Sequence, residues 1–189
     1  MLPVTEYGYN NGKMAAINQL PELRRQAHAI SLIIRPITPT DDTQMATIVR
    51  KDLEEAGFAL PGTAYFDPQL DRLSAFYAGQ PNGAYWVLSD KVGQVYGGGG
   101  IGPYAPGIAE LQKLYIRADR RGFGDGQRLI DCALTYARQH YPQVYLETFV
   151  ALRAANHLYA KNGFVALDAP LPGSEHSACD AWWLLQFEK

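Results

Sequence analysis

Residues 114–130 read LYIRADRRGFGDGQRLI and contain the pattern that decides the fold. A β-rich start leads through a short basic, glycine-rich turn into apolar residues at helical spacing, so the segment predicts a strand, a turn and an amphipathic helix. The first N–H groups of a helix have no partner within it, and its N-terminus carries about half a positive charge. Glycines at 122, 124 and 126 leave the backbone accessible, so the turn is typical of a site for a phosphate.

Other glycine-rich anion sites have a different spacing. An ATP-binding P-loop needs GxxxxGK[ST], which the sequence lacks, and a dinucleotide-binding turn needs GxGxxG, which Gly122, Gly124 and Gly126 do not provide. A glycine turn that only joins a strand to a helix stays open as an alternative, although Arg120 and Arg121 favour an anion site.

The flanking sequence predicts the order β-α-α-β-β-β-α-β-α-β-β, which is a mixed α/β sheet with helices on its faces. Asp67 is expected to cap the second helix, with Pro68 at its first position. The expected strands cover about 32–35, 85–88, 94–96, 110–116, 144–149, 164–168 and 181–187, and the expected helices end near 57, 79, 140 and 161.

Length and composition favour one domain with an extension. The chain has 189 residues, of which 47% are hydrophobic and 19% charged, so a core can be buried. Residues 1–30 are interpreted as an N-terminal extension that offers a helix around 14–28, interrupted by Pro21, and residues 31–189 as the domain.

Charge and cysteine usage exclude several classes. With 17 Lys+Arg against 19 Asp+Glu the net charge is -2, which provides no field for nucleic acid or an anionic membrane. The start lacks a basic stretch followed by a long apolar run, so we expect a soluble, cytoplasmic protein. Cys132 and Cys179 form no CxxC pair, which predicts reduced thiols and no metal site.

Two segments resemble one family. RGFGDG at 121–126 is similar to the R/Q-x-x-G-x-G/A signature of the GNAT superfamily of N-acetyltransferases. ANHLYAKNGF at 155–164 is similar to the second signature, A-x-x-L-Y-x-K-x-G-F, at the expected distance. The resemblance covers about residues 31–188, and the ELQKLY strand with the H-x-x-C-D-x-W ending at 176–182 resembles small bacterial members.

The resemblance implies a GNAT-like fold, a mixed and mostly antiparallel sheet with a splayed wedge between two central strands. It implies acetyl-CoA as co-substrate, with the pantetheine beside strand 110–116 and the acetyl carbonyl on backbone N–H groups of Leu114 and Tyr115. The cofactor-binding residues that it implies are Leu114, Tyr115, Ile116, Arg121, Gly122, Phe123, Gly124, Asp125, Gly126, Asn156 and Tyr159, the backbone of 122–126 holding the pyrophosphate.

Acetyl transfer to an amine needs a neutral nucleophile and a proton for the departing thiolate. Tyr159 stands where the family has the tyrosine that protonates the CoA sulfur, with core packing as the alternative. Glu110 matches the general base of the histone acetyltransferase branch. Glu147 is a rival base or a ligand for the acceptor ammonium, and His176 is a third candidate whose alternative is a solvated loop residue.

One position departs from the family pattern. The family commonly has an asparagine seven residues before the tyrosine, and this sequence has Leu152 there. Asn156 shares a helix face with Tyr159, so it is either a substitute contact with CoA or a surface residue.

The resemblance therefore predicts an acetyl-CoA-dependent N-acetyltransferase that acts by direct transfer on the primary amine of a small-molecule or amino-acid-like acceptor. Acceptor residues are expected in the aromatic stretch 63–66 with Phe76 and Tyr77, in the loop 170–177, and among the acids Asp67, Asp71, Glu110 and Glu147. The alternatives are a non-catalytic acetyl-CoA-binding regulatory module, a protein or peptide N-acetyltransferase, and a plain nucleotide-phosphate binder. Because members of the family often dimerise, the resemblance also implies that the N-terminal helix is a candidate contact in a homodimer.

Overall fold

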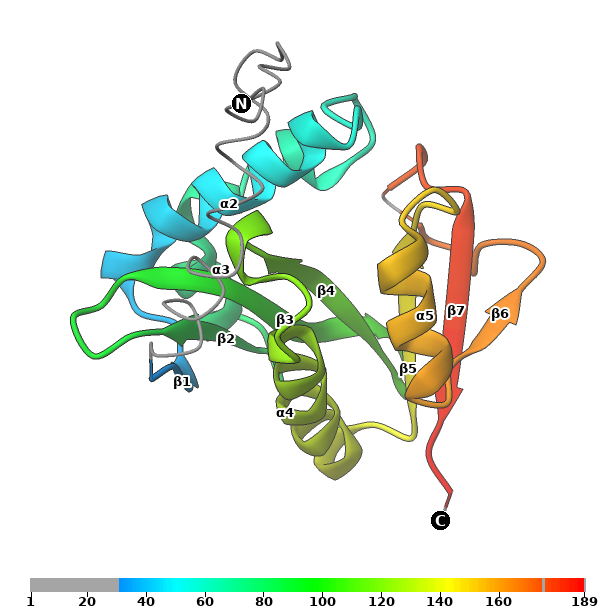
Figure 1. Cartoon of the computed structure of the whole chain (residues 1–189). Helices are drawn as coiled ribbons and strands as arrows, with labels where there is room; N and C mark the ends of the chain where they lie inside the picture. The colour runs from blue at the N-terminus through cyan, green and yellow to red at the C-terminus, as the bar shows by residue number, and fades with distance from the viewer. Residues whose placement is uncertain (1–30, 175, 189) are drawn as a thin grey trace, which may run out of the picture. The chain divides into compact units, whose positions relative to one another are not determined.

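The computed structural model describes residues 31–174 and 176–188, so the predicted extension at residues 1–30 lies outside the described residues. The described chain forms a seven-stranded sheet in the order β1-β2-β3-β4-β5-β7-β6 (Figure 1). Within this part of the chain β4 and β5 are the one parallel pair of neighbours, and the other neighbours are antiparallel. The predicted mixed, mostly antiparallel sheet is confirmed.

The elements follow the predicted order. The strands are β1 Ile33–Pro36, β2 Ala84–Ser89, β3 Val95–Ala105, β4 Ile108–Ile116, β5 Gln143–Thr148, β6 Val165–Leu167 and β7 Ala181–Gln186. The helices are α2 Asp42–Glu55, α3 Leu73–Ala78, α4 Asp125–His140 and α5 Arg153–Lys161, with 3-10 turns η1 Pro39–Asp41, η2 Ala64–Phe66, η3 Leu70–Arg72 and η4 Ala118–Arg120. None of the described helices has the length and apolar character needed to cross a membrane.

Helices cover both faces of the sheet, because side chains alternate between the faces along each strand. On one face α2 and α3 pack against Tyr85 and Val87 of β2. On the other face α4 packs against Leu111 of β4 and Leu146 of β5, and Tyr159 of α5 belongs to the same cluster. The two cores lie on opposite sides of one sheet, as the predicted layers require.

The sheet opens in its middle, between β4 and β5. These strands pair only at Ile108–Glu110 and Gln143–Tyr145, although β4 continues to Ile116 and β5 to Thr148. Figure 1 shows the two halves of the sheet diverging beyond this short pairing. The splayed wedge between two central strands is therefore confirmed.

The second predicted helix begins later than expected, which corrects the assignment of Asp67 and Pro68 to its start. The chain forms the 3-10 turn η3 first, and α3 begins at Leu73. Asp42 of α2 caps α3 instead, because its carboxylate accepts hydrogen bonds from the N–H of Ser74 at 2.8 Å and from its hydroxyl at 2.6 Å. The cap comes from 32 residues away in the chain, so no local pattern identifies it.

Strand β3 is longer than predicted, because the four glycines at 97–100 lie within it. A Cβ on Gly98 would lie 2.7 Å from Cε1 of Tyr85, and one on Gly99 would lie 2.8 Å from Cδ1 of Leu114. The glycines are therefore needed for packing on both faces of the sheet, which outweighs the low strand propensity of glycine.

Replacement of Gly100 by alanine is expected to destabilise the fold. The new Cβ would lie 2.5 Å from Cδ2 of Tyr85 and 2.9 Å from two carbons of the Tyr77 ring, so the core must shift. We expect the free energy of unfolding to fall by about 1–3 kcal/mol in urea titrations. Gly79→Ala is the matched control, since its nearest neighbours lie at 3.6 Å, and we expect a change within about 0.5 kcal/mol. Equal stability of both variants would contradict this packing role.

Candidate active site

The glycine-rich turn lies at the N-terminus of α4, as predicted. Gly122 has φ +81° and Gly124 has φ +83°, which L side chains rarely adopt. Nothing lies within 4 Å of a Cβ built at either position, so the backbone there faces open space. Gly124 is the N-cap of the 16-residue helix α4, and this combination of open backbone and helix terminus suits an anion.

A buried ion pair fixes the shape of this turn. Asp125 Oδ2 accepts hydrogen bonds from Arg120 Nη2 at 2.8 Å and from Arg120 Nε at 3.0 Å. Asp125 Oδ1 accepts a third hydrogen bond, from Arg128 at 3.1 Å, and the Arg120 guanidinium stacks on the ring of Phe123. The Asp125 side chain thus stabilises the turn, and the contact of its backbone with CoA stays a prediction.

A cleft of about 900 Å³ runs from this turn along β4 and α5. The predicted site residues that line it are Glu110, Leu114, Tyr115, Ile116, Arg121, Gly122, Gly124, Gly126, Glu147, Tyr159 and His176. Three further predicted residues, Phe123, Asp125 and Asn156, are outside the set that lines the cleft. The wedge between β4 and β5 and the anion turn therefore belong to one continuous cavity.

A bulge in β4 shapes the wall of this cleft. Gly98 pairs with Tyr115 and Gly100 pairs with Gln112, so Gly99 alone faces Lys113 and Leu114. Lys113 has φ 51°, in the left-handed region, and its carbonyl accepts a hydrogen bond from the Tyr85 hydroxyl at 2.9 Å. The bulge interrupts the ladder with β3 beside the predicted position of the acetyl group.

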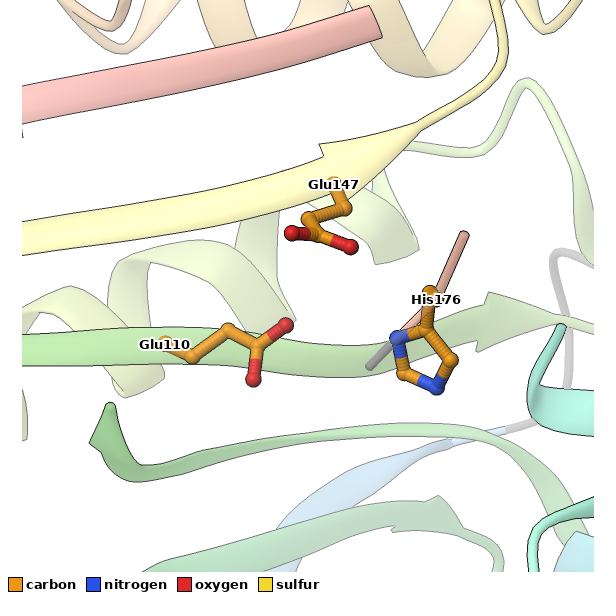
Figure 2. A group of neighbouring side chains, drawn as sticks. All are labelled: Glu110, Glu147 and His176. Carbon is orange, nitrogen blue, oxygen red and sulfur yellow. The ribbon is translucent and has the colours of Figure 1, made fainter. Parts of the chain in front are cut away.

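Two carboxylates and an imidazole gather where the strands part. The pleat places Glu110, Tyr145 and Glu147 on one face, because Glu110 pairs with Tyr145 and Glu147 follows two residues later. Glu110 and Glu147 each offer a carboxylate oxygen and His176 offers a ring nitrogen, and these atoms lie within 4.8 Å of one another (Figure 2). The group attracts cations, so an ammonium or a metal ion would find counter-charges there.

The two carboxylates have different surroundings. Glu110 is 9% exposed and accepts a hydrogen bond from Gln112 at 2.6 Å. Burial raises the pKa of Glu110, and the Glu147 carboxylate adds to the rise, against opposing effects of Gln112 and His176. Glu147 accepts hydrogen bonds from the hydroxyls of Tyr145 and Ser174, both at 2.9 Å. The surroundings of Glu110 thus favour its protonated form more than water would.

Tyr159 of α5 is buried and lines the cleft. Its ring packs near Phe164 and Trp183, with centroids 6.0 and 6.5 Å away, so it has the core role left open above as well as access to the cleft. Burial raises the pKa of the Tyr159 phenol, which keeps the hydroxyl protonated as a donor.

Asn156 is engaged within the protein. Its amide nitrogen donates to the carbonyl of Phe149 at 2.8 Å and to that of Leu152 at 3.0 Å, and its amide oxygen accepts from Trp183 Nε1 at 2.9 Å. These bonds tie α5 to the segment that follows β5 and to Trp183 of β7. They give Asn156 a structural role and leave its contact with CoA a prediction without further support.

The sequence did not predict the partners of three polar residues in this region, Asp67, Gln112 and Lys113. The Lys113 ammonium is buried and lies 2.6 Å from Asp67 Oδ2, and Gln112 links Glu110 to the Tyr77 hydroxyl. Asp71, in contrast, forms an exposed pair with Arg50. Contacts between distant parts of the chain determine the φ of Lys113 and the position of Asp67. Only the alternation of polar residues along β4 indicates these partners in the sequence.

Arg121, beside the glycine-rich turn, donates a hydrogen bond to the carbonyl of Ile116 at 3.2 Å and forms an ion pair with Asp52 of α2.

Cys132 and Cys179 are free thiols, and burial raises the pKa of Cys179, which lines the cleft, to about 12. The Cys179 thiol is therefore a poor nucleophile at neutral pH.

Comparison with known proteins identifies relatives of this chain. The family model described as acetyltransferase (GNAT) family matches residues 47–164. An uncharacterized N-acetyltransferase of Escherichia coli strain K12, YjgM, is 37% identical over 155 residues, which cover 79% of this chain and 92% of that protein.

Solved structures share the fold. A GNAT-family acetyltransferase from Staphylococcus aureus superposes with a TM-score of 0.71 at 18% identity, over 84% of this chain and 100% of that one. The PaiA N-acetyltransferase of Thermoplasma acidophilum, solved in complex with coenzyme A, has a TM-score of 0.64 at 15% identity, over 84% of this chain and 100% of that one.

Loss of the Asp125 carboxylate is expected to loosen the turn. In Asp125→Asn the Arg120 guanidinium stays buried without its full counter-charge, so we expect the free energy of unfolding to fall by about 3 kcal/mol. Asp119→Asn is the matched control, because Asp119 is 60% exposed and its pair with Arg117 is worth about 1 kcal/mol or less. Urea titration measures both, and equal losses would show that the buried pair has no special role.

Proposed function

The chain belongs to the acetyltransferase (GNAT) family, and we propose that it transfers an acetyl group from acetyl-CoA directly to the primary amine of a small-molecule or amino-acid-like acceptor. The observation that carries the proposal is the continuity of one cleft from the anion turn to the carboxylates where β4 and β5 part. One end suits the phosphates of the donor, and the other suits the ammonium of the acceptor.

The donor half rests on three features. The N-terminus of α4 and the open backbone of Gly122 and Gly124 suit a pyrophosphate. Arg121, which is 49% exposed beside them, supplies a cation. Beyond Glu110, the edge of β4 that faces β5 has no partner strand, so it can hydrogen-bond the amides of pantetheine as a further strand would. Coenzyme A in the Thermoplasma relative supports the same donor here.

The acceptor half rests on Glu110, Glu147 and the segments around them. Two carboxylates bind an ammonium group, and Glu110, with its raised pKa, is the group that deprotonates it. Ser174 and His176 belong to the loop 170–177 that the sequence singled out for the acceptor, and both reach this group. A cleft of about 900 Å³ that also takes the donor favours a small acceptor.

The proposed reaction balances as follows. The acceptor ammonium gives one proton to Glu110, and the neutral amine attacks the thioester carbonyl carbon. As the C–N bond forms and the C–S bond breaks, Tyr159 gives its proton to the sulfur, and the second proton of the nitrogen restores the phenol. The products are the acetylated amine and free CoA, with one proton released.

Gly126 offers a direct test of the phosphate site. A Cβ there would lie 3.5 Å from Leu158 Cδ2, and the residue lies in the first turn of α4 without a positive φ, so a side chain causes little strain. We expect Gly126→Asp to weaken CoA binding at least tenfold more than the neutral, isosteric Gly126→Asn, measured by calorimetry. Equal affinities of the two variants would exclude a phosphate at this position.

Tyr159→Phe separates turnover from binding. We expect kcat for acetylation of a panel of amines, including tyramine and 1,4-diaminobutane, to fall about 100-fold, because the general acid is lost. The Kd for acetyl-CoA should stay within about threefold, because the ring still packs. Unchanged kcat would contradict the role of Tyr159, and binding without turnover of any amine by the wild type would favour the non-catalytic module.

Titration of Glu110 should contribute to the acid limb of the pH profile. Because burial raises its pKa, activity should rise with pH through a midpoint above the usual carboxylate value of about 4.3, and Glu110→Gln should lower the plateau. Steady-state rates between pH 5 and 9 provide the measurement. A Glu110→Gln variant with the wild-type rate and profile would transfer the role of base to another group.

A further inference from the structure

A row of charged side chains lies beside the proposed acceptor carboxylates. Lys113 Nζ lies 2.6 Å from Asp67 Oδ2, and the Lys113 side chain is 2% exposed. His176 Nε2 lies 3.4 Å from both carboxylate oxygens of Asp67. These residues come from β4, from the segment before η3 and from the loop before β7, and the reaction above uses neither Asp67 nor Lys113.

Asp67 determines which way the imidazole faces. A carboxylate only accepts hydrogen bonds, so the nitrogen beside it, Nε2, carries the hydrogen in neutral His176 and the lone pair is on Nδ1. Figure 2 shows one ring nitrogen on the side of Glu110 and Glu147 and the other facing away. Since Nε2 is the nitrogen at Asp67, Nδ1 is the one that faces the carboxylates.

A proton taken up by Glu110 needs a way out, because Glu110 is 9% exposed. The His176 side chain is 19% exposed, and imidazole gains and loses protons near neutral pH. A carboxylate oxygen of Glu110 and a ring nitrogen of His176 lie within 4.8 Å of each other, a separation that one water molecule spans. His176 is thus the neighbour of Glu110 that is suited to pass a proton to the solvent.

We propose that Asp67 is a positioning residue that holds the His176 imidazole with Nδ1 toward Glu110, so that His176 relays the acceptor's proton from Glu110 to solvent. This inference rests on the proposed function. The ammonium proton moves to the Glu110 carboxylate and then to Nδ1, and the imidazolium releases it to water in the cleft. Lys113 neutralises Asp67, which allows this carboxylate to stay ionised although it is largely buried.

The charges around His176 define the expected pH response. Asp67 and Lys113 lie on one side of the ring, and Glu110 and Glu147 on the other. The hydrogen bond with Asp67 raises the pKa of His176, Glu110 adds to the rise, and burial and Lys113 oppose it. Below that pKa the imidazole holds a proton and the relay is blocked. Loss of the Asp67 charge should therefore move the acid limb of activity to lower pH.

The test is histidine NMR combined with kinetics on the full chain. In the wild type, nitrogen chemical shifts should show neutral His176 with its hydrogen on Nε2, the resonance being assigned by its absence in His176→Gln. Because the chain has four histidines, assignment is direct. In Asp67→Asn the pKa of His176 should fall by about one pH unit. If the single variant fails to fold, the double variant Asp67→Asn/Lys113→Met allows the same pKa measurement, because it leaves no buried, unpaired ammonium.

Kinetics use the panel amine that the wild type acetylates fastest, with EDTA present to exclude bound metal. We expect Asp67→Asn to lower the plateau kcat about tenfold, which is less than the loss of about 100-fold or more expected when a group that itself transfers the proton is removed. The acid limb should move with the His176 pKa. Asp119→Asn is the matched control, because Asp119 is 60% exposed in its pair with Arg117, and it should change neither quantity.

Several outcomes would overturn the relay. A hydrogen on Nδ1 in the wild type, or a His176 pKa that does not move in either Asp67 variant, would show that Asp67 does not position the ring. A shifted pKa with unchanged kcat and acid limb would show that His176 carries no proton in the reaction. Failure of the wild type to bind acetyl-CoA would instead contradict the proposed function, and the NMR result would still decide the role of Asp67.

Discussion

The parting of β4 from β5 after the Glu110–Tyr145 pair is the constraint on which the rest of the structure depends. Beyond that pair, two strands in the middle of a sheet have backbone groups that no neighbouring strand satisfies, which is costly unless water or a ligand supplies partners. The wedge also brings side chains of both strands to one cleft. A chain that carries amides can therefore bind there, with its reactive end beside Glu110 and Tyr159.

Polar contacts bridge the two halves of the sheet across the acceptor end of the wedge. His176 of the loop before β7 reaches Asp67, and the N–H of Ala178 donates to the carbonyl of Gly62 at 3.2 Å. At the donor end, Gln127 of α4 and Asn162 after α5 are hydrogen-bonded at 2.8 Å. The residues that hold the wedge at a fixed width are thus close to those proposed to act on substrates, so stability and activity are coupled in this region.

Local patterns were enough to predict the order of the elements, the glycine-rich turn and the wedge, the last through the resemblance that two motifs carried. Features made by distant residues were not predictable. Asp67 is of a residue type that often caps helices, but Lys113 and His176 bind it, and Asp42 caps α3 instead. The glycine run of β3 has weak strand propensity, and its place is fixed only by the rings that pack on it. Asn156 was expected as a substitute contact with CoA because it shares a helix face with Tyr159, and tertiary hydrogen bonds engage its amide.

The most direct test of the account is a crystal structure of the protein with acetyl-CoA. The account predicts the pyrophosphate on the backbone N–H groups of 122–126, the pantetheine along β4 where β5 has left it, and the thioester sulfur within hydrogen-bond distance of the Tyr159 hydroxyl. Acetyl-CoA bound outside the wedge, or a wedge that stays closed to it at saturating concentration, would contradict the central claim that the parted strands form the donor site.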